Sequence, residues 1–208
     1  MTRGKFITIE GAEGVGKTTS IAFIEDYFKQ AGQAILLTRE PGGTPLAEKI
    51  RDLLLDARQT SMSDDTELLL MFAARAQHLQ EKIIPALEAG QWVICDRFTD
   101  ATYAYQGGGR GIDRTRIASL EAWVQGDLRP DMTLLLDLPV ELGLKRAGER
   151  SAPDRFEQEK QEFFERVRAA YLAMAAAEPQ RYRIIDASGS IDEVQYRIKR
   201  VLDELTAP

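Results

Sequence analysis

Short apolar runs alternate along the chain with longer stretches in which apolar residues recur at helical spacing. The runs have the length of buried strands, and they are KFITIE, AILLT, WVICD, MTLLLDL and RYRIIDA. Helical patterns separate them, for example from Lys17 to Ala31 and between Pro45 and Ala89. Strands that alternate with helices in this way indicate a parallel sheet with helices on both faces. The pattern therefore predicts an α/β fold with five parallel strands.

The carboxyl ends of these strands are the expected place for the chemistry, because ligands of parallel α/β sheets bind there. Glycine-rich segments follow the strands: GAEGVG after the first, PGG after the second and GGGRG some way after the third. We interpret the last of these, at 107–111, as a flexible loop rather than a second phosphate site. The strand ends to be searched are Glu10, Thr38, Cys95, Leu138 and Ala187.

Composition narrows the classes of function. With 208 residues the chain is expected to form one domain, residues 1–208. Its formal net charge of −6 argues against a nucleic-acid partner. The first residues lack the pattern of a signal peptide, and no run approaches the roughly 20 apolar residues of a membrane span. We therefore expect a cytoplasmic protein with neither a nucleic-acid nor a membrane partner.

Two residue types occur once each. Cys95 lies in the apolar run WVIC and is interpreted as an inert core residue. His78 lies in the helical pattern MFAARAQHL, where we expect it on the helix surface or in packing. A chain with one histidine offers little scope for Ser-His-Asp or Cys-His chemistry.

The segment GAEGVGKT at 11–18 fits the phosphate-loop motif G-x-x-x-x-G-K-[ST], between a strand and a helix. Backbone N–H groups of such a loop point at phosphate oxygens, Lys17 supplies a cation and the Thr18 hydroxyl can reach Mg²⁺. The expected nucleotide-binding residues are Gly11, Ala12, Glu13, Gly14, Val15, Gly16, Lys17, Thr18 and Thr19.

The lack of asparagine excludes two classes of nucleotide-using protein. A regulatory GTPase needs Asn-Lys-x-Asp for guanine, and a protein kinase needs an Asn for Mg²⁺. A clear general base is also missing. A phosphate monoester acceptor is largely dianionic at pH 7, so transfer to it needs positioning and charge neutralisation rather than a base.

Three further motifs carry a family resemblance: REPGGTP at 39–45, DRFTDATYAYQGGGRG at 96–111 and KRAGERSAPDRFEQE at 145–159. Together, and in this order, they closely resemble bacterial thymidylate kinases over essentially the whole chain. The resemblance implies the nucleoside-monophosphate kinase form of the P-loop NTPase fold, with a mobile LID at about 146–156. It also implies a homodimer and the reaction of ATP with dTMP, assisted by Mg²⁺, to give ADP and dTDP.

The resemblance assigns catalytic roles to Lys17, Arg97 and Arg150. Arg97 should bind the dTMP phosphate, since the planar guanidinium suits bidentate contacts. Asp96 ends the run WVICD and should hold Mg²⁺ through water, together with Thr18; the alternative for Asp96 is an N-cap or an ion pair. The phosphate loop has no arginine, so the LID supplies one, with Arg146 and Arg155 as alternatives to Arg150. The same charged segment predicts a helix capped near Asp154.

The implied acceptor site consists of Glu13, Glu40, Arg51, Phe72, Arg75, Arg97, Thr102, Tyr105 and Gln106. Phe72 and Arg75 share a helical face, so that Phe72 could stack on thymine while Arg75 bonds its carbonyl edge. Core packing of Phe72, with Met71 in the stacking position, is the alternative. Arg51 is either a second phosphate clamp or a surface charge.

Three side chains in this site have finer roles. Tyr105 can crowd the sugar against a 2′-hydroxyl, and Gln106 can offer its amide to the base. Glu13 is assigned to the dTMP side, bonded to the 3′-hydroxyl directly or through water or Mg²⁺. The alternative for Glu13 is a solvent-facing carboxylate.

Two other functions remain open from the residues alone. One is a kinase of a different monophosphate or of a deoxynucleoside, because a phosphate loop does not select a base. The other is a nucleotide-dependent switch that hydrolyses ATP without an acceptor. For the homodimer, the patterns at 68–79 and 117–124 could supply an apolar face.

Overall fold

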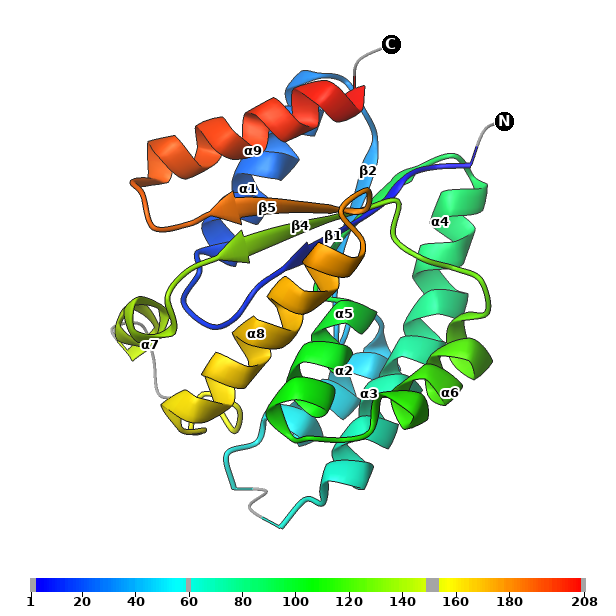
Figure 1. Ribbon diagram of the computed structural model, residues 1–208. Helices are drawn as coiled ribbons and strands as arrows, with labels where there is room; N and C mark the ends of the chain where they lie inside the picture. The colour runs from blue at the N-terminus through cyan, green and yellow to red at the C-terminus, as the bar shows by residue number, and fades with distance from the viewer. Residues whose placement is uncertain (1–2, 59–60, 149–153, 207–208) are drawn as a thin grey trace.

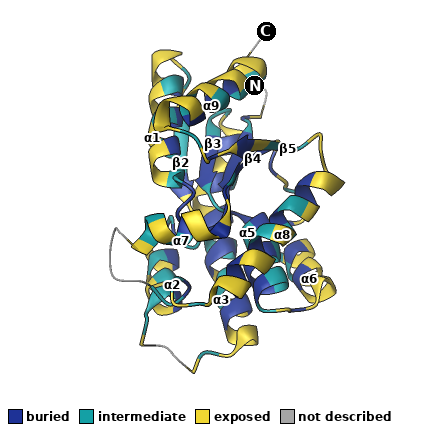
Figure 2. Ribbon diagram, turned by 60° about the vertical axis from the view of Figure 1, so that its left-hand side comes forward, coloured by how far each residue is buried: buried dark blue, intermediate teal, exposed yellow. Residues whose placement is uncertain are grey.

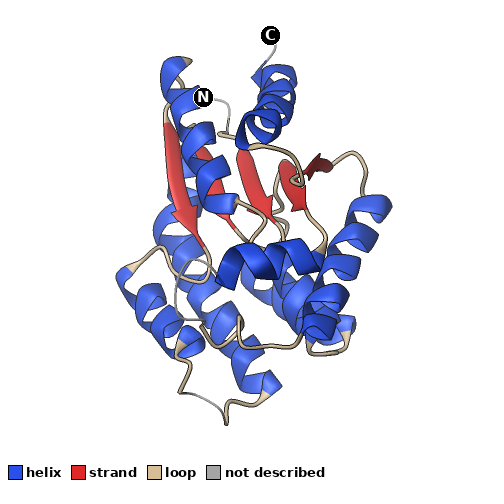
Figure 3. Ribbon diagram, turned by 90° about the vertical axis from the view of Figure 1, so that its left-hand side faces the viewer, coloured by secondary structure: helices blue, strands red, loops and turns tan. Residues whose placement is uncertain are grey.

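The computed structural model describes residues 3–58, 61–148 and 154–206, and in these ranges five strands form one sheet (Figures 1 and 3). The strands are β1 (Phe6–Glu10), β2 (Ile35–Arg39), β3 (Trp92–Asp96), β4 (Met132–Asp137) and β5 (Tyr182–Asp186). Their order is β2-β3-β1-β4-β5, and every pairing is parallel. The predicted five-stranded parallel α/β fold is confirmed.

Helices cover both faces of the sheet. They are α1 (Lys17–Gln30), α2 (Pro45–Leu55), α3 (Asp64–His78), α4 (Ile84–Glu88), α5 (Thr99–Thr102), α6 (Arg114–Gln125), α7 (Val140–Gly148), α8 (Gln161–Ala177) and α9 (Ile191–Thr206). Two π-helical segments, η1 (Leu79–Ile83) and η2 (Tyr103–Gly109), continue α3 and α5. In Figure 1, α1 and α9 lie together on one side of the sheet, and α3, α5 and α8 lie on the other.

Alternating strand residues pack against the two helical layers. Ile7 and Ile9 of β1 belong to the cluster that holds α1 and α9, whereas Phe6 packs with η1 and α4. Successive side chains of a strand point to opposite faces, so an uninterrupted apolar run is buried on both sides. Figure 2 shows the result, dark buried strands inside helices whose outer faces are exposed. Cys95 is buried in the second cluster, as expected.

The helical pattern between Pro45 and Ala89 forms separate helices, and capping residues mark the points where α2 and α3 begin. Thr44 accepts a hydrogen bond from the Ala47 N–H to start α2, and Ser63 accepts from the Thr66 N–H to start α3. These side chains satisfy N–H groups that have no partner within the helix.

Two local expectations are wrong. The helix expected near Asp154 begins at Gln161 instead, because Asp154 Oδ1 accepts from the N–H groups of Phe156 and Glu157 and so caps a single turn. The glycines at 107–109 belong to the π-helical segment η2 rather than to a flexible loop, whereas Gly111 lies between η2 and α6, outside any helix. A Cβ atom on Gly109 would lie 2.4 Å from the Phe163 ring, so glycine there lets η2 approach α8 closely.

Among the helices in the described residues, none is long and apolar enough to cross a membrane.

Candidate active site

The phosphate loop joins β1 to α1, and α1 begins at Lys17. Gly14 has a φ of 70°, and a Cβ atom there would lie 1.8 Å from the carbonyl oxygen of Gly143 in α7. Glycine is therefore required for the loop to pack on α7. The loop side chain Lys17 holds its Nζ 3.4 Å from the carbonyl oxygens of Gly11 and Ala12. Burial and Arg97 lower the pKa of Lys17, while Glu13 acts in the opposite direction.

A cavity of about 260 Å³ opens beside this loop, at the carboxyl ends of β1, β2 and β3. It reaches from the phosphate loop to α3 and η2. The predicted residues that line it are Glu13, Gly14, Val15, Gly16, Lys17, Thr18, Glu40, Arg51, Arg75, Asp96, Arg97, Thr102, Tyr105 and Gln106. Residues of the predicted site that do not line it are Gly11, Ala12, Thr19 and Phe72. The fold thus brings most of the predicted donor and acceptor residues around one space.

Phe72 packs in the core, 2% exposed, with Leu68 and Ile117, and Met71 lines the cavity instead. This position contradicts the prediction that Phe72 stacks on thymine and agrees with its core-packing alternative. Adjacent helical residues differ by about 100° in direction, so only one of them can face the cavity. The Phe72 ring still contacts the site indirectly, 4.7 Å from the Arg75 guanidinium.

Glu13 points towards the acceptor side of the cavity. Its Oε1 accepts hydrogen bonds from Arg97 Nη2 at 2.7 Å and from the Tyr105 hydroxyl at 2.9 Å. Burial would raise the pKa of Glu13, but Arg97, Lys17 and the bond from Tyr105 outweigh it and lower the pKa to about 2. The solvent-facing alternative is thus wrong. Arg97 also lies 4.7 Å from the Tyr105 ring, so these three side chains form one unit.

Arg97 has a φ of 66° and is the one non-glycine residue with a positive φ in the described ranges. This backbone strain costs roughly 1–3 kcal/mol and must be held by surrounding contacts. The Arg97 N–H donates to the Ile9 carbonyl at 3.0 Å. The next N–H, from Phe98, donates to Glu10 Oε1 at 2.7 Å, and Tyr171 donates to Glu10 Oε2 at 2.7 Å.

The carboxyl group of Glu10 is fully buried beneath this turn. Burial and the nearby Asp100 carboxylate raise the pKa of Glu10 to about 8, although the hydrogen bonds from Tyr171 and Phe98 act in the opposite direction. The sequence identifies Glu10 only as the end of a strand and assigns it no role. The one feature that could have pointed to this role is an acidic residue at the end of an apolar run.

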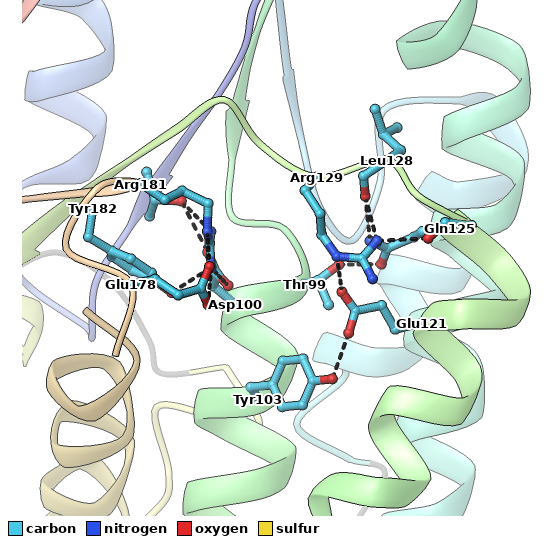
Figure 4. Close-up of polar contacts among 12 residues, drawn as sticks. Thr99, Asp100, Tyr103, Glu121, Gln125, Leu128, Arg129, Glu178, Arg181 and Tyr182 are labelled. Carbon is cyan, nitrogen blue, oxygen red and sulfur yellow. Dashed lines mark hydrogen bonds and ion pairs between the residues drawn. The ribbon is translucent and has the colours of Figure 1, made fainter. Parts of the chain in front are cut away.

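Two polar clusters hold α5, the short helix that follows Arg97 (Figure 4). On one side Asp100 receives two bonds from Arg181, at 2.5 and 3.0 Å, and Arg181 also pairs with Glu178. On the other side the Thr99 hydroxyl donates to Gln125 of α6. The turn that presents Arg97 is therefore fixed by elements far away in the sequence.

Arg75 and Glu40 form a buried pair, with Arg75 Nε 2.7 Å from Glu40 Oε2. Arg75 Nη2 donates to the Thr102 hydroxyl, and Nη1 is buried with no hydrogen-bond partner among the described residues. His78 is fully buried, 3.0 Å from Glu40 Oε1 and 2.6 Å from the Thr38 hydroxyl. Of the two positions expected for His78, the packed one is confirmed and the helix surface is wrong, since both ring nitrogens are hydrogen-bonded inside the protein.

Arg51 donates through Nη1 to the Pro41 carbonyl at 2.9 Å and lines the cavity. Burial and the neighbouring Arg39 lower the pKa of Arg51. This position agrees better with a phosphate clamp than with a surface charge.

Asp96 and Thr18 fit a magnesium ion. The Oδ1 of Asp96 is buried and finds no hydrogen-bond partner in the part of the chain that the structure describes. Neither an ion pair nor an N-cap role is found for Asp96 there, and Phe98 is the residue at the start of α5. The described residues contain no cluster of three or more His, Cys, Asp or Glu that could hold a metal. Water and phosphate oxygens would have to complete the shell, as Mg²⁺ prefers.

Arg150 lies outside the described residues. Of its alternatives, Arg146 donates to the Ala187 carbonyl at 3.1 Å, and Arg155 donates to the Leu54 carbonyl at 2.8 Å. Arg155 Nη2 also lies 2.6 Å from Glu67, a buried residue of α3. Both alternatives are thus engaged by protein groups, and neither lines the cavity.

The chain is similar to known proteins over nearly its whole length. The sequence model of one family, described as thymidylate kinase, matches residues 9–198. A thymidylate kinase of Pseudomonas syringae pv. tomato is 60% identical over 202 residues, which cover 97% of this chain and 96% of the relative. One of Alcanivorax borkumensis is 55% identical over 98% of each chain. The crystal structure of thymidylate kinase from Ehrlichia chaffeensis has a TM-score of 0.79, at 34% identity over 97% of this chain and 99% of that one.

Proposed function

Because the chain belongs to the thymidylate kinase family, we propose that it transfers the γ-phosphate of ATP to dTMP and releases ADP and dTDP. The observation that carries this proposal is one continuous cavity that is bordered by the phosphate loop at one end and by Arg75 and Gln106 at the other. A donor and an acceptor nucleotide can meet in such a space with the reacting groups between them. We also propose that the protein works in the cytoplasm.

The donor half binds ATP through the loop N–H groups and Lys17. Thr18, and Asp96 through water, hold Mg²⁺, which neutralises charge on the phosphate oxygens when bound. Arg150 is proposed to complete the charge neutralisation over the phosphates and to exclude water.

The acceptor half holds dTMP. Arg97 and Arg51 clamp its phosphate, and the rigid turn beneath Arg97 sets the line of attack. Glu13 accepts a hydrogen bond from the 3′-hydroxyl, while Tyr105 limits the space beside the sugar. The dianionic phosphate needs no proton removed, so catalysis consists of alignment and electrostatic stabilisation.

The base lies deeper, where Met71 packs on its face. Arg75 offers its unpaired Nη1 to a base carbonyl, and Gln106 meets the adjacent edge. Thr102 and Glu40 keep the Arg75 guanidinium in place.

A homodimer through α3 and α6 is also proposed. These helices pack on each other and leave Leu69 56% and Trp123 83% exposed. Large exposed apolar side chains on neighbouring helices are typical of an interface. Sedimentation of the wild type and of Trp123→Glu tests this: we expect a dimer for the first and a shift to monomer for the second. A monomeric wild type would contradict it.

The reaction is tested by ADP release with ATP and Mg²⁺ over a panel of acceptors: none, dTMP, dUMP, dCMP and dGMP. We expect ADP formation that depends on dTMP. A switch protein would form ADP slowly without an acceptor, and a different monophosphate kinase would prefer another member of the panel. No stimulation by dTMP rejects the proposal.

A further inference from the structure

Glu67 of α3 is a buried carboxylate that does not line the cavity but contacts a residue that does. It is 1% exposed. Its Oε1 accepts from Gln106 Nε2 at 2.8 Å, and its Oε2 lies 2.6 Å from Arg155 Nη2 and 3.2 Å from Arg110 Nη2. Two guanidinium groups thus compensate its charge, and in this setting the carboxylate accepts hydrogen bonds only.

This contact fixes which way the Gln106 amide points. An acceptor-only neighbour binds the NH₂ end of an amide, so the Nε2 of Gln106 must face Glu67. Its Oε1 then points the other way, and no donor to it is found among residues 3–58, 61–148 and 154–206. Because Gln106 lines the cavity, the group that it offers to a ligand is an acceptor.

Arg75 supplies the opposite polarity nearby. Its Nε and Nη2 are used by Glu40 and Thr102, and its Nη1 is buried and unpaired in the described part of the chain. The base end of the cavity therefore presents one fixed acceptor and one fixed donor. Thymine and uracil match this pair with an N3–H donor beside a 4-carbonyl acceptor. Cytosine has the reverse, an N3 acceptor beside a 4-amino donor. It would place an acceptor against the Gln106 oxygen and a donor against the Arg75 Nη1 group.

We propose that Glu67 is a positioning residue for base specificity: by holding the Gln106 amide in one orientation, it makes the cavity select bases with an N3–H and a 4-carbonyl over cytosine. The inference rests on the proposed function, because it takes the acceptor base to lie against Gln106 and Arg75. A site built around buried polar groups rejects a mismatched ligand strongly, since each mismatch leaves groups unpaired.

The test is the ratio of kcat/KM for dTMP to kcat/KM for dCMP, measured for the wild type and for Glu67→Gln. The new amide can donate to Gln106 Oε1, so that Gln106 can turn and offer its NH₂ group to the base. We expect the ratio to fall by about 10-fold to 100-fold, with KM for ATP unchanged. An unchanged ratio overturns the inference.

Glu121→Gln is the matched control. Glu121 is a carboxylate of similar burial that pairs with Arg129 and Tyr103 away from the cavity (Figure 4). Its substitution removes an equivalent buried charge, so we expect lower stability and an unchanged ratio. A fall of the ratio in this variant as large as in Glu67→Gln would overturn the inference, because loss of stability alone would then explain both.

Gln106→Ala tests the selecting group itself, even if Glu67→Gln does not fold, and it should lower the ratio by itself. Where Glu67→Gln folds, adding it to Gln106→Ala should change the ratio no further, because Glu67 acts through Gln106. A Gln106→Ala protein with the wild-type ratio overturns the inference. If the wild type prefers dTMP and these variants keep the same ratio, the inference about Glu67 is rejected while the proposed function stands. A wild type that dTMP does not stimulate rejects the proposed function and this inference with it.

Discussion

The two halves of the cavity are built by different means. The centre of the donor half is one continuous loop, and it offers backbone N–H groups and a lysine that follow each other along the chain. The acceptor half collects side chains from separate elements, and carboxylates hold them: Glu13 holds Arg97, Glu40 holds Arg75, and Glu67 holds Gln106. A backbone loop needs little further support, whereas each cationic or amide side chain needs a buried partner to keep one orientation. Substitutions should therefore have different signatures in the two halves.

The largest effect on activity is expected from a substitution in the donor half of the cavity. Arg150→Ala should lower kcat by about 10³-fold, as removal of an arginine that stabilises a transferring phosphoryl group does. The loss should be equal for dTMP and dUMP, because the donor half does not contact the base. ADP release under saturating substrates measures it. Arg146→Ala and Arg155→Ala serve as comparisons with smaller losses in kcat, and near-normal turnover of the Arg150 variant would discard this assignment.

On the acceptor side, Glu13→Gln should lower kcat/KM for dTMP by about 10-fold to 100-fold, within the cost of a lost hydrogen bond to a charged group. Part of the loss comes from Arg97, which also relies on Glu13. The two causes separate when 3′-deoxy-dTMP replaces dTMP, since that substrate has no 3′-hydroxyl to lose. We expect a smaller loss with the analogue, and equal losses would count against the 3′-hydroxyl role.

The two halves of the cavity also differ in how far the sequence predicts them. The phosphate loop and the five strands depend on residues close together in the sequence, so the motif and the apolar periodicity are sufficient to predict them. The partners of the acceptor half lie far apart, such as Glu67 with Gln106 and Asp100 with Arg181. A glutamate in a helix looks the same in sequence whether it faces water or a buried arginine. For the same reason the sequence leaves open whether His78 lies on the helix surface or in packing.

A third effect concerns stability and pH, and it compares Glu10 with Glu13. The folded-state pKa of Glu10 is raised to about 8 from an ordinary value of 4.5. Between pH 4.5 and pH 8, Glu10 is therefore protonated in the folded protein and ionised in the unfolded protein. Its contribution to stability is complete below pH 4.5 and is lost as the pH rises through 8. Glu13, with its pKa lowered to about 2, contributes above pH 4.5 and loses that contribution as the pH falls through 2.

Urea unfolding from pH 5 to 8 measures the Glu10 contribution. We expect the free energy of unfolding to fall with pH more steeply in the wild type than in Glu10→Gln, by up to about 1.4 kcal/mol per pH unit for one proton. Asp131→Asn is a suitable control, because Asp131 also accepts a bond from a backbone N–H, that of Phe6 at the other end of β1, but is partly exposed. Parallel pH curves for the wild type and Glu10→Gln would show that Glu10 is not the titrating group.

The smallest effect on activity separates two neighbours on α3. Met71 lines the cavity, so Met71→Ala should raise KM for dTMP by about threefold to tenfold, roughly the effect of losing one buried methylene group, and leave KM for ATP unchanged. Phe72 is in the core, so Phe72→Ala should cost about 3–5 kcal/mol of stability. The KM of Phe72→Ala for dTMP should change only because the guanidinium of Arg75, which packs on the Phe72 ring, is held less firmly. If Phe72→Ala raised KM for dTMP more than Met71→Ala at a temperature where both are folded, the ring and not the thioether would contact the base, and the assignment of the two residues would have to be exchanged.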